Sequence, residues 1–395
     1  MKIAFITSDY PRLDGGAYRY AVFLVRELAK LGHKVTVFTS ELYDTHFEQR
    51  ETKNLKVVEV KISKRLPYPA LQFWLLLPKA IRKAEKANLF DILHFNGYSY
   101  WFLKKKISSA PHIVTVHHLV RDAIKNTNQN IMYRLLNVST ETNIVYPFLE
   151  RRVISLNSQK IICVSDFTKK RITETYNIPF DDIETIYNGI EVDGYIRTKQ
   201  ELEEIKNVLQ VPGTPVILYV GRVDDTRKGL DLLLVAFKKL AESIDATLLI
   251  VGPGNNTRAK KTAQSLGILK NTVFAGSVDE ITLKKCYALC DLYVFPSRLE
   301  GFGLPLLEAS AAGKPIIATN VGAIPELVKM GINATLIHPD DVSALSDSML
   351  KFFQHRESHE HLKARAIESL EKFSWKTTAE KTSRLYEQLI ERNVE

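Results

Sequence analysis

Cysteine is scarce in this chain of 395 residues, so a disulfide framework is not expected. The three cysteines, Cys163, Cys286 and Cys290, are too few and too scattered to pair as a set. Cys286 and Cys290 could share one helix face, but no His or Cys pair accompanies them, and we interpret them as packing residues rather than zinc ligands. So little cysteine is typical of a reducing compartment, and we expect a cytosolic protein.

Long apolar runs are also lacking. No stretch approaches the roughly 18 apolar residues that a membrane-spanning helix needs. The longest candidate, residues 66–78, contains three prolines. The first ten residues carry one lysine and a short apolar run, which predicts a buried strand rather than a signal peptide.

Positive charge is concentrated in the first half of the chain. Residues 1–190 carry 28 Lys and Arg against 18 Asp and Glu, whereas residues 191–395 carry 26 against 27. A basic half beside a neutral half indicates contact with an anionic ligand or surface. Because the chain has no basic-aromatic RNA-binding motif and no zinc-finger spacing, nucleic acid is not an expected partner.

Short β-rich apolar runs alternate with amphipathic helical patterns along the chain. This alternation is typical of parallel sheets with helices on both faces, and the chain length favours two domains. We therefore predict an α/β protein with two Rossmann-like domains, 1–188 and 189–372, joined by a polar segment after Tyr187, and a final helix over 373–395. The predicted strands are 2–7, 33–40, 55–62, 91–96, 112–118, 160–165, 183–188, 215–221, 246–252, 272–276, 292–297, 314–320 and 334–339.

Residues that follow the predicted strands are the candidates for a site, because ligands of open parallel sheets bind beyond the carboxyl ends of the strands. After the first strand, Gly15 and Gly16 open a helix whose bare N–H groups suit a phosphate, although paired glycines also occur in ordinary turns. In the second half, Arg222 and Lys228 follow a strand that ends at Gly221. Two cations aimed into a cleft suit a diphosphate, and the alternative is a solvated loop.

Two glutamates bracket the glycine-rich turn of the segment SRLEGFGLPLLEASAAGKP, residues 297–315. Glu300 precedes a predicted helix that Pro305 opens and Gly313 ends, and Glu308 lies inside that helix. The N–H groups at the helix start can bind an anion, and a nearby carboxylate can accept hydrogen bonds from hydroxyls attached to it. The alternative for Glu308 is an ordinary exposed glutamate.

Histidines end two predicted strands of the first half. His117 and His118 are adjacent, so that one faces each side of the strand, and His94 has a similar place one strand earlier. A lone strand-end histidine is more often a hydrogen-bonded structural group than a catalyst. Two further loops, one at Gly254 and one at Ser277 and Val278, are suited to a flat base lying along the backbone.

Together these motifs resemble the retaining glycosyltransferases of family 4, whose GT-B architecture has two facing Rossmann-like domains. The resemblance rests on the paired glycines near the start, on NGIEVD, on GRVDDTRKGLDLLL and on PSRLEGFGLPLLEASAAGKPIIATNVGAIPELV, in the family's order over almost the whole chain. It implies transfer of a sugar from a nucleoside-diphosphate sugar to a hydroxyl acceptor. It also implies that the last helix crosses back to the first domain.

The resemblance implies a role for each motif. Glu300 would meet the hydroxyls of the donor sugar and Glu308 the ribose, Arg222 and Lys228 would hold the diphosphate, and His117 would lie near the anomeric region. We therefore expect His117, Arg222, Lys228 and Glu300 to be catalytic. The other expected donor-binding residues are Gly15, Gly16, Asn188, Gly221, Gly254, Ser277, Val278, Gly301, Phe302, Gly303, Leu304 and Glu308.

No Asp-x-Asp triplet occurs in the sequence. A metal–diphosphate site like that of the other major glycosyltransferase fold is therefore not expected, and neither is a cofactor. Arg222 and Lys228 would instead neutralise the charge of the departing diphosphate. A nucleotide-sugar epimerase of the same fold and a non-catalytic nucleotide-sugar binding protein are alternatives, although the motif around Glu300 favours transferases.

The acceptor does not follow from the resemblance, but one segment indicates a membrane. Basic flanks around a short aromatic and apolar run are typical of a segment that binds an anionic lipid surface without spanning it. The acceptor would then be a lipid or lipid-linked glycan at the cytoplasmic face. If the segment only packs on the sheet, a soluble acceptor is the better choice. The residues concerned are Lys61, Lys64, Arg65, Tyr68, Phe73, Trp74, Lys79, Arg82 and Lys83.

Overall fold

The chain forms two compact units in a computed structural model. The first comprises Met1–Lys125, Gln129–Gly189 and Phe373–Glu395, and the second comprises Ile190–Lys372. The structure describes residues 1–8, 10, 15–40, 52–63, 69–87, 89–97, 107–125, 150, 154, 160–212, 215–355 and 368–394.

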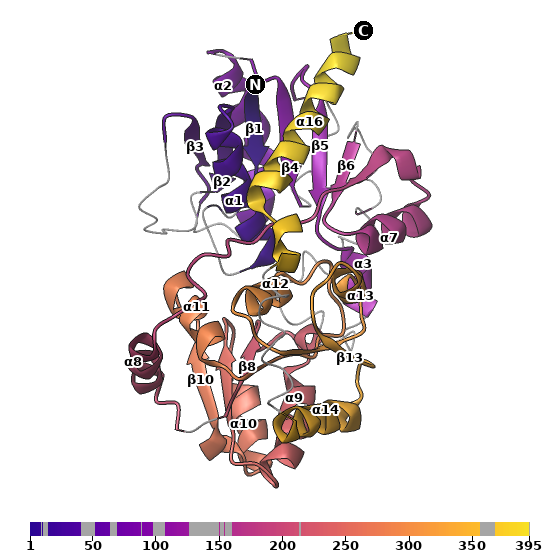
Figure 1. Cartoon of the computed structure of the whole chain (residues 1–395). Helices are drawn as coiled ribbons and strands as arrows, with labels where there is room; N and C mark the ends of the chain where they lie inside the picture. Colours follow the sequence, from indigo (N-terminus) through magenta and orange to yellow (C-terminus); the bar gives the residue numbers. More distant parts are fainter. Residues whose placement is uncertain are drawn as a thin grey trace. The chain divides into compact units, whose positions relative to one another are not determined.

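The first unit is built on a seven-stranded sheet in the order β3-β2-β1-β4-β5-β6-β7, with every neighbouring pair parallel (Figure 1). The central strands are runs of Ile, Val and Phe because helices cover both faces of such a sheet. The strands are β1 (Lys2–Ile6), β2 (Lys34–Ser40), β3 (Leu55–Val60), β4 (Ile92–Asn96), β5 (His112–Val116), β6 (Lys160–Cys163) and β7 (Ile183–Thr185). The helices are α1 (Gly16–Lys30), α2 (Pro69–Glu85), α3 (Val120–Lys125), α7 (Asp166–Tyr176) and α16 (Trp375–Val394).

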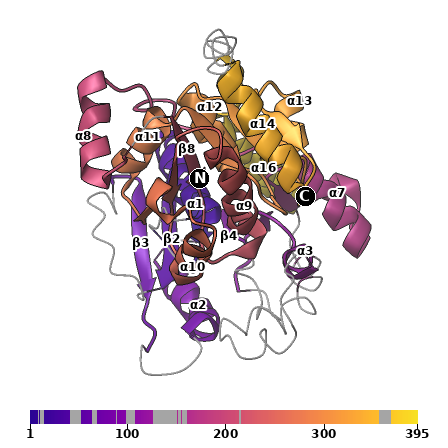
Figure 2. The ribbon, with the colours of Figure 1, turned by 90° about the horizontal axis from the view of Figure 1, so that it is seen from below.

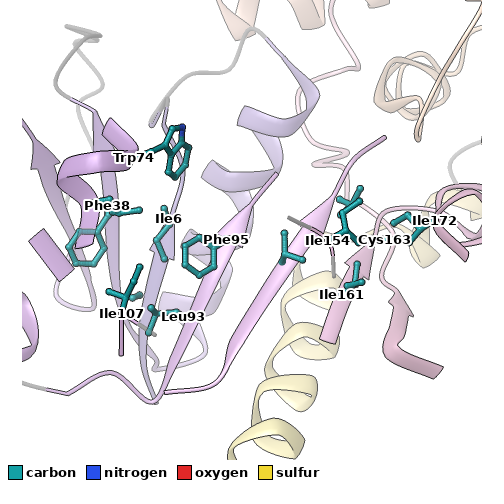
Figure 3. Close-up of a cluster of buried hydrophobic side chains, with 14 of the residues drawn as sticks. Ile6, Phe38, Trp74, Leu93, Phe95, Ile107, Ile154, Ile161, Cys163 and Ile172 are labelled. Carbon is teal, nitrogen blue, oxygen red and sulfur yellow. The ribbon is translucent and has the colours of Figure 1, made fainter. Parts of the chain in front are cut away.

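One hydrophobic core of the first unit lies against this sheet (Figure 3). Ile6 of β1, Phe38 of β2 and Phe95 of β4 meet Trp74 of α2 there. Cys163 belongs to the same core, and Cys286 and Cys290 are buried free thiols in the second unit. The interpretation of the cysteines as packing residues is confirmed.

The last helix, α16, packs on the first unit beside α1 (Figure 1). Trp375 at its start stacks on Phe23 of α1, with ring centroids 5.3 Å apart. Further along, the Ser383 hydroxyl lies 2.8 Å from Nε2 of His33, and the Tyr386 hydroxyl is hydrogen-bonded to Nδ1 of His94. These contacts join the end of the chain to its first ninety-odd residues.

The second unit has a six-stranded parallel sheet in the order β10-β9-β8-β11-β12-β13. Helices α9 and α14 lie side by side over it (Figures 1 and 2). The strands are β8 (Val216–Val220), β9 (Thr247–Val251), β10 (Thr272–Gly276), β11 (Leu292–Phe295), β12 (Ile316–Thr319) and β13 (Thr335–Ile337). The helices are α8 (Lys199–Leu209), α9 (Leu230–Ala241), α10 (Thr257–Ser265), α11 (Glu280–Leu289), α12 (Leu304–Ala311), α13 (Ile324–Lys329) and α14 (Val342–Gln354).

The predicted α/β fold with two Rossmann-like sheets is confirmed. Every predicted strand is present, and most are a few residues shorter than the sequence suggested. Some residues that were predicted in strands, among them Thr7, His117 and Gly221, instead follow the strands in the loops at the carboxyl edges. Among the described helices, none combines the length and the apolar character needed to cross a bilayer.

Candidate functional site

The candidate site of the second unit lies at the carboxyl ends of β8 and β11, which are neighbours in its sheet. Gly221 and Arg222 directly follow β8, and a short 3₁₀ turn, η2 (Thr226–Lys228), leads into α9. Residues 296–303 follow β11 and lead into α12. The predicted cations and the predicted glutamates therefore come from two adjacent loops.

Lys228 and Glu300 form an ion pair in this site. The Lys228 ammonium donates to Oε1 of Glu300 at 2.6 Å, and the Ser297 hydroxyl donates to the same oxygen at 2.8 Å. Glu300 is buried, and a buried carboxylate needs such partners to offset its lost hydration. The sequence predicted a role for each residue but not that they would pair with each other.

Arg222 is held more loosely. Its side chain is 47% exposed, and its nearest carboxylate among the described residues is Asp224, at 3.8 Å. Gly254 approaches the same carboxylate, since a Cβ at this position would lie 2.4 Å from Oδ1 of Asp224. Arg222 is therefore at the edge of the site with its guanidinium still available to an anion.

Glu308 is not an exposed helix glutamate. It lies inside α12 with 3% of its surface exposed, and it accepts a 2.7 Å hydrogen bond from the Tyr287 hydroxyl. Burial, together with the Glu308 carboxylate, raises the pKa of Tyr287, so the hydroxyl remains a donor. Burial, with smaller contributions from the Glu308 and Glu300 carboxylates, likewise raises the pKa of Tyr293.

Helix α12 begins as the sequence predicted. Gly303 is its N-cap at φ +104°, Pro305 lies in the first turn, and no side chain in the described part of the chain caps the first N–H groups. Leu304 and Phe302 are buried, so they supply backbone to the site rather than exposed side chains. Gly301 lies in the same turn, and Ser277 and Val278 follow β10 at the same edge of the sheet.

The candidate residues of the first unit lie around the start of α1. Gly15 is the extended N-cap and Gly16 the first residue of that helix. His117 directly follows β5; its Nε2 lies 2.8 Å from Oδ1 of Asn96, and its ring meets the Tyr20 ring edge-on at 5.0 Å. Loss of hydration lowers the pKa of His117 to about 4.

His94 corrects one prediction. It lies inside β4 rather than at the end of the strand, and it is fully buried. Its ring is hydrogen-bonded to the Tyr386 hydroxyl through Nδ1 and to Thr115 through Nε2, the latter at 2.7 Å. Burial lowers the pKa of His94 to about 3. His94 is therefore a structural residue that ties α16 to the sheet.

Asn188 is buried just before the end of the first unit, and its Oδ1 has no hydrogen-bond partner among the described residues. Gly189 follows it in close contact with Trp375, whose backbone nitrogen would lie 2.2 Å from a Cβ at position 189. The described parts of the chain contain no group of three or more His, Cys, Asp or Glu placed to hold a metal ion.

Two protein-family profiles match this chain. The first, described as Glycosyltransferase Family 4, matches residues 14–193. The second, described as Glycosyl transferases group 1, matches residues 201–369. The chain belongs to family 4 of the glycosyltransferases.

Relatives of this glycosyltransferase match it along nearly its whole length. A phosphatidyl-myo-inositol mannosyltransferase of Mycobacterium leprae is 25% identical, over 98% of this chain and 96% of the relative. An N-acetyl-alpha-D-glucosaminyl L-malate synthase of Bacillus anthracis is 26% identical, over 94% of this chain and 92% of the relative. The crystal structure of Anabaena HepE in complex with UDP-glucose has a TM-score of 0.77 and 18% identity, over 98% of this chain and 100% of that one. The enzyme is thus a sugar transferase with the GT-B fold.

Sequence analysis did not identify Arg298, which forms hydrogen bonds to the η2 turn of this glycosyltransferase. Its guanidinium makes two 2.9 Å bonds to Asp231, and also bonds Asp340 and the Thr226 carbonyl, both at 2.6 Å. Its backbone N–H donates to the Arg227 carbonyl at 2.7 Å. Arg298 therefore connects the loop of Glu300 to the turn of Lys228. The only signal was an arginine two residues before Glu300, and its acidic partners are distant in sequence.

Proposed function

We propose that this glycosyltransferase moves a hexose-type sugar from a nucleoside-diphosphate sugar to a hydroxyl acceptor, with retention at the anomeric carbon. The pairing of Lys228 with Glu300 at the carboxyl edge of the second sheet carries the proposal. The Lys228 ammonium can bind a diphosphate, and the Glu300 carboxylate, 2.6 Å away, can accept hydrogen bonds from sugar hydroxyls. A nucleoside-diphosphate sugar carries its diphosphate and its sugar hydroxyls next to each other, which matches this pair. The UDP-glucose in the HepE structure supports a donor of this class.

In this proposal, donor binding exchanges the partners of the ion pair. The diphosphate takes the Lys228 ammonium, assisted by Arg222 and by the N–H groups of Gly303 and Leu304. Glu300, still held by Ser297, then accepts hydrogen bonds from the sugar hydroxyls. No buried charge is left without a partner at either stage, which keeps the electrostatic cost of binding low.

The remaining roles follow the family resemblance. Glu308 accepts hydrogen bonds from the ribose hydroxyls. His117 contacts the sugar near its anomeric region, and the backbone of Gly16 contacts the diphosphate. The bond between the anomeric carbon and the phosphate oxygen breaks as the acceptor oxygen attacks the same face. The acceptor proton passes to the leaving diphosphate, whose developing charge Arg222 and Lys228 stabilise. The proposal requires no metal for this step.

Changing Glu308 to glutamine is expected to weaken nucleotide binding, whereas changing Glu300 to glutamine is expected to impair sugar transfer. Glu308→Gln should raise the Kd of the free nucleoside diphosphate by about tenfold or more, because charge-assisted hydrogen bonds to the ribose contribute roughly 1.5–3 kcal/mol. Glu300→Gln should leave that Kd nearly unchanged and lower sugar transfer instead. Calorimetric titration with UDP, GDP and ADP, together with turnover of the intact donor, separates the two. Equal nucleotide Kd for wild type and Glu308→Gln would refute the ribose role.

For the acceptor, we propose a lipid or lipid-linked glycan reached from an anionic membrane surface. The support is one face of α2, where Leu75 and Leu76 are 61% and 41% exposed and are followed by exposed Lys79, Arg82 and Lys83. Two exposed leucines with basic neighbours on a helix are typical of a segment that lies on lipid. The name of the mycobacterial relative specifies a phospholipid acceptor, whereas that of the Bacillus relative specifies L-malate.

The structure corrects part of the membrane prediction. Phe73 and Trp74 are buried in the core of the first unit, so these aromatics pack on the sheet and do not face lipid. Lys64, Arg65 and Tyr68 lie outside the described residues. The contact is therefore assigned to the leucines and cations of α2.

Vesicle co-sedimentation at low salt tests this surface. Binding to anionic but not to neutral vesicles is expected, and changing Lys79, Arg82 and Lys83 to Gln should weaken it about 100-fold, at about 1 kcal/mol per cation. The matched control changes three exposed lysines of the second unit to Gln and should bind as wild type does. No sedimentation with anionic vesicles would leave a soluble acceptor as the better assignment. The control lysines are Lys239, Lys261 and Lys270.

A further inference from the structure

The side chain of Asn96, the last residue of β4, makes three hydrogen bonds, and one of them reaches His117. Its side-chain nitrogen donates to the Ala17 carbonyl at 3.0 Å and to the Thr7 hydroxyl at 3.3 Å. Its side-chain oxygen lies 2.8 Å from Nε2 of His117. Asn96 therefore joins the strand-end histidine to the first turn of α1, next to Gly16.

The chemistry of these partners fixes which atoms carry protons. A backbone carbonyl can only accept, so the Asn96 atom facing Ala17 must be the amide NH₂. The Asn96 oxygen then faces Nε2 of His117, and an amide oxygen can only accept. Nε2 of His117 must therefore carry a proton.

The environment of His117 keeps the ring neutral. Loss of hydration lowers the pKa of His117 to about 4, so near neutral pH the ring holds one proton. Among the described residues, the titratable groups packed near it include His94 of β4, also neutral, and Tyr20 of α1, whose hydroxyl is 3.0 Å from that of Thr115. With its single proton on Nε2, the ring has a bare lone pair on Nδ1.

We propose that Asn96 is a positioning residue that holds His117 as the Nε2–H tautomer, so that Nδ1 accepts a hydrogen bond from a hydroxyl of the transferred sugar. This inference rests on the proposed function, which assigns His117 to the sugar. In this arrangement His117 orients the donor and does not transfer a proton. Because Asn96 bonds both His117 and the Ala17 carbonyl, it connects the His117 ring to the first turn of α1, which begins at Gly16.

The tautomer can be read directly by long-range ¹H–¹⁵N NMR of the ligand-free protein with ¹⁵N-labelled histidine. His117→Gln identifies the signals of His117 among those of the ten histidines. Wild type should show a single neutral ring protonated at Nε2. Asn96→Leu, which fills the space without an acceptor, should give a mixture of tautomers. Asn96→Asp keeps an acceptor for Nε2 and should retain the proton there, although it loses the donor that bonds the Ala17 carbonyl.

Unchanged His94 signals and an unchanged melting temperature show that a variant is folded, and the wild-type spectrum is decisive even if Asn96→Leu fails to fold. Sugar transfer should fall at least tenfold in Asn96→Leu and less in Asn96→Asp. A wild-type ring protonated at Nδ1, or an Asn96→Leu ring still protonated only at Nε2, would overturn the inference. So would unchanged transfer alongside a changed tautomer. If wild type transferred no sugar from any donor, the proposed function would fail, while the tautomer measurement would still decide the role of Asn96.

Discussion

Replacing Lys228 with alanine is expected to lower sugar transfer by about 10²–10³-fold, the usual effect of removing one preorganised group that stabilises developing charge. Lys228 is positioned by η2 and paired with Glu300, so that in the proposed mechanism its ammonium is already oriented before a diphosphate binds. Its loss also leaves the buried Glu300 carboxylate with Ser297 as its remaining described donor. Arg222→Ala should likewise lower turnover by orders of magnitude, because its exposed guanidinium is available to the same diphosphate.

The matched control for these variants is Lys238→Ala. Lys238 lies on α9 in the same unit and pairs with Glu242 at the surface. Steady-state turnover of the donor and the melting curve should be unchanged in this control. Arg222→Ala should melt as wild type does, whereas Lys228→Ala should melt at a lower temperature, because its buried Glu300 carboxylate loses a partner, but should still be folded at the assay temperature. Rates near wild type for both Arg222→Ala and Lys228→Ala would remove the diphosphate clamp from the mechanism.

Gly322→Ala is expected to abolish most activity, while Gly267→Ala is tolerated. Both glycines have positive φ, at +58° and +73°, so alanine costs about 1–2 kcal/mol of left-handed strain at either position. Only at Gly322 would the new Cβ overlap a neighbour, since it would lie 1.9 Å from the carbonyl oxygen of Glu300. That oxygen also accepts a 3.2 Å hydrogen bond from Ala323. The Glu300 loop must therefore move.

A displacement of about 1 Å in a catalytic loop can cost about 100-fold in rate. Turnover in Gly322→Ala should fall by at least that factor, whereas Gly267→Ala should lose only stability, because its Cβ would meet no described atom within 4 Å. Thermal melting of the Gly322→Ala and Gly267→Ala variants measures the effect of backbone strain on stability. Their donor turnover measures the effect of displacing the Glu300 loop. Equal turnover in the two variants would show that the position of Glu300 does not limit the reaction.

The fold was predictable because its signals are local. Most strands are short apolar runs bounded by polar residues, glycine or proline, and the alternation with helices leaves few topologies for two parallel sheets. The start of α12 was equally clear, since Gly303 and Pro305 act through their own backbone geometry. Loop residues after strands could be ranked as candidates by the general rule for open parallel sheets.

The pairings within the site were not predictable, because they join residues far apart in sequence. Lys228 and Glu300 are separated by 72 residues, and nothing in either motif signals the other. The same holds for Glu308, whose hydrogen-bond partner Tyr287 lies on another helix, and for Asn96, which meets His117 because β4 and β5 are neighbours. The structural role of His94 could not be seen in the sequence either, because its hydrogen-bond partner Tyr386 lies 292 residues away.

The most direct test of the central claim is consumption of a nucleotide sugar by the purified wild-type enzyme. UDP-, GDP- and ADP-linked hexoses would be offered singly, with anionic lipid extract or with a set of soluble hydroxyl compounds as acceptor. Nucleoside diphosphate would be followed by ³¹P NMR and the glycoside by ¹H NMR. If the proposed function is correct, a donor is consumed, the glycoside keeps its anomeric configuration, and Lys228→Ala lowers the rate at least 100-fold. A product of inverted configuration, or a folded wild-type enzyme that consumes no donor and binds no nucleoside diphosphate, would contradict it.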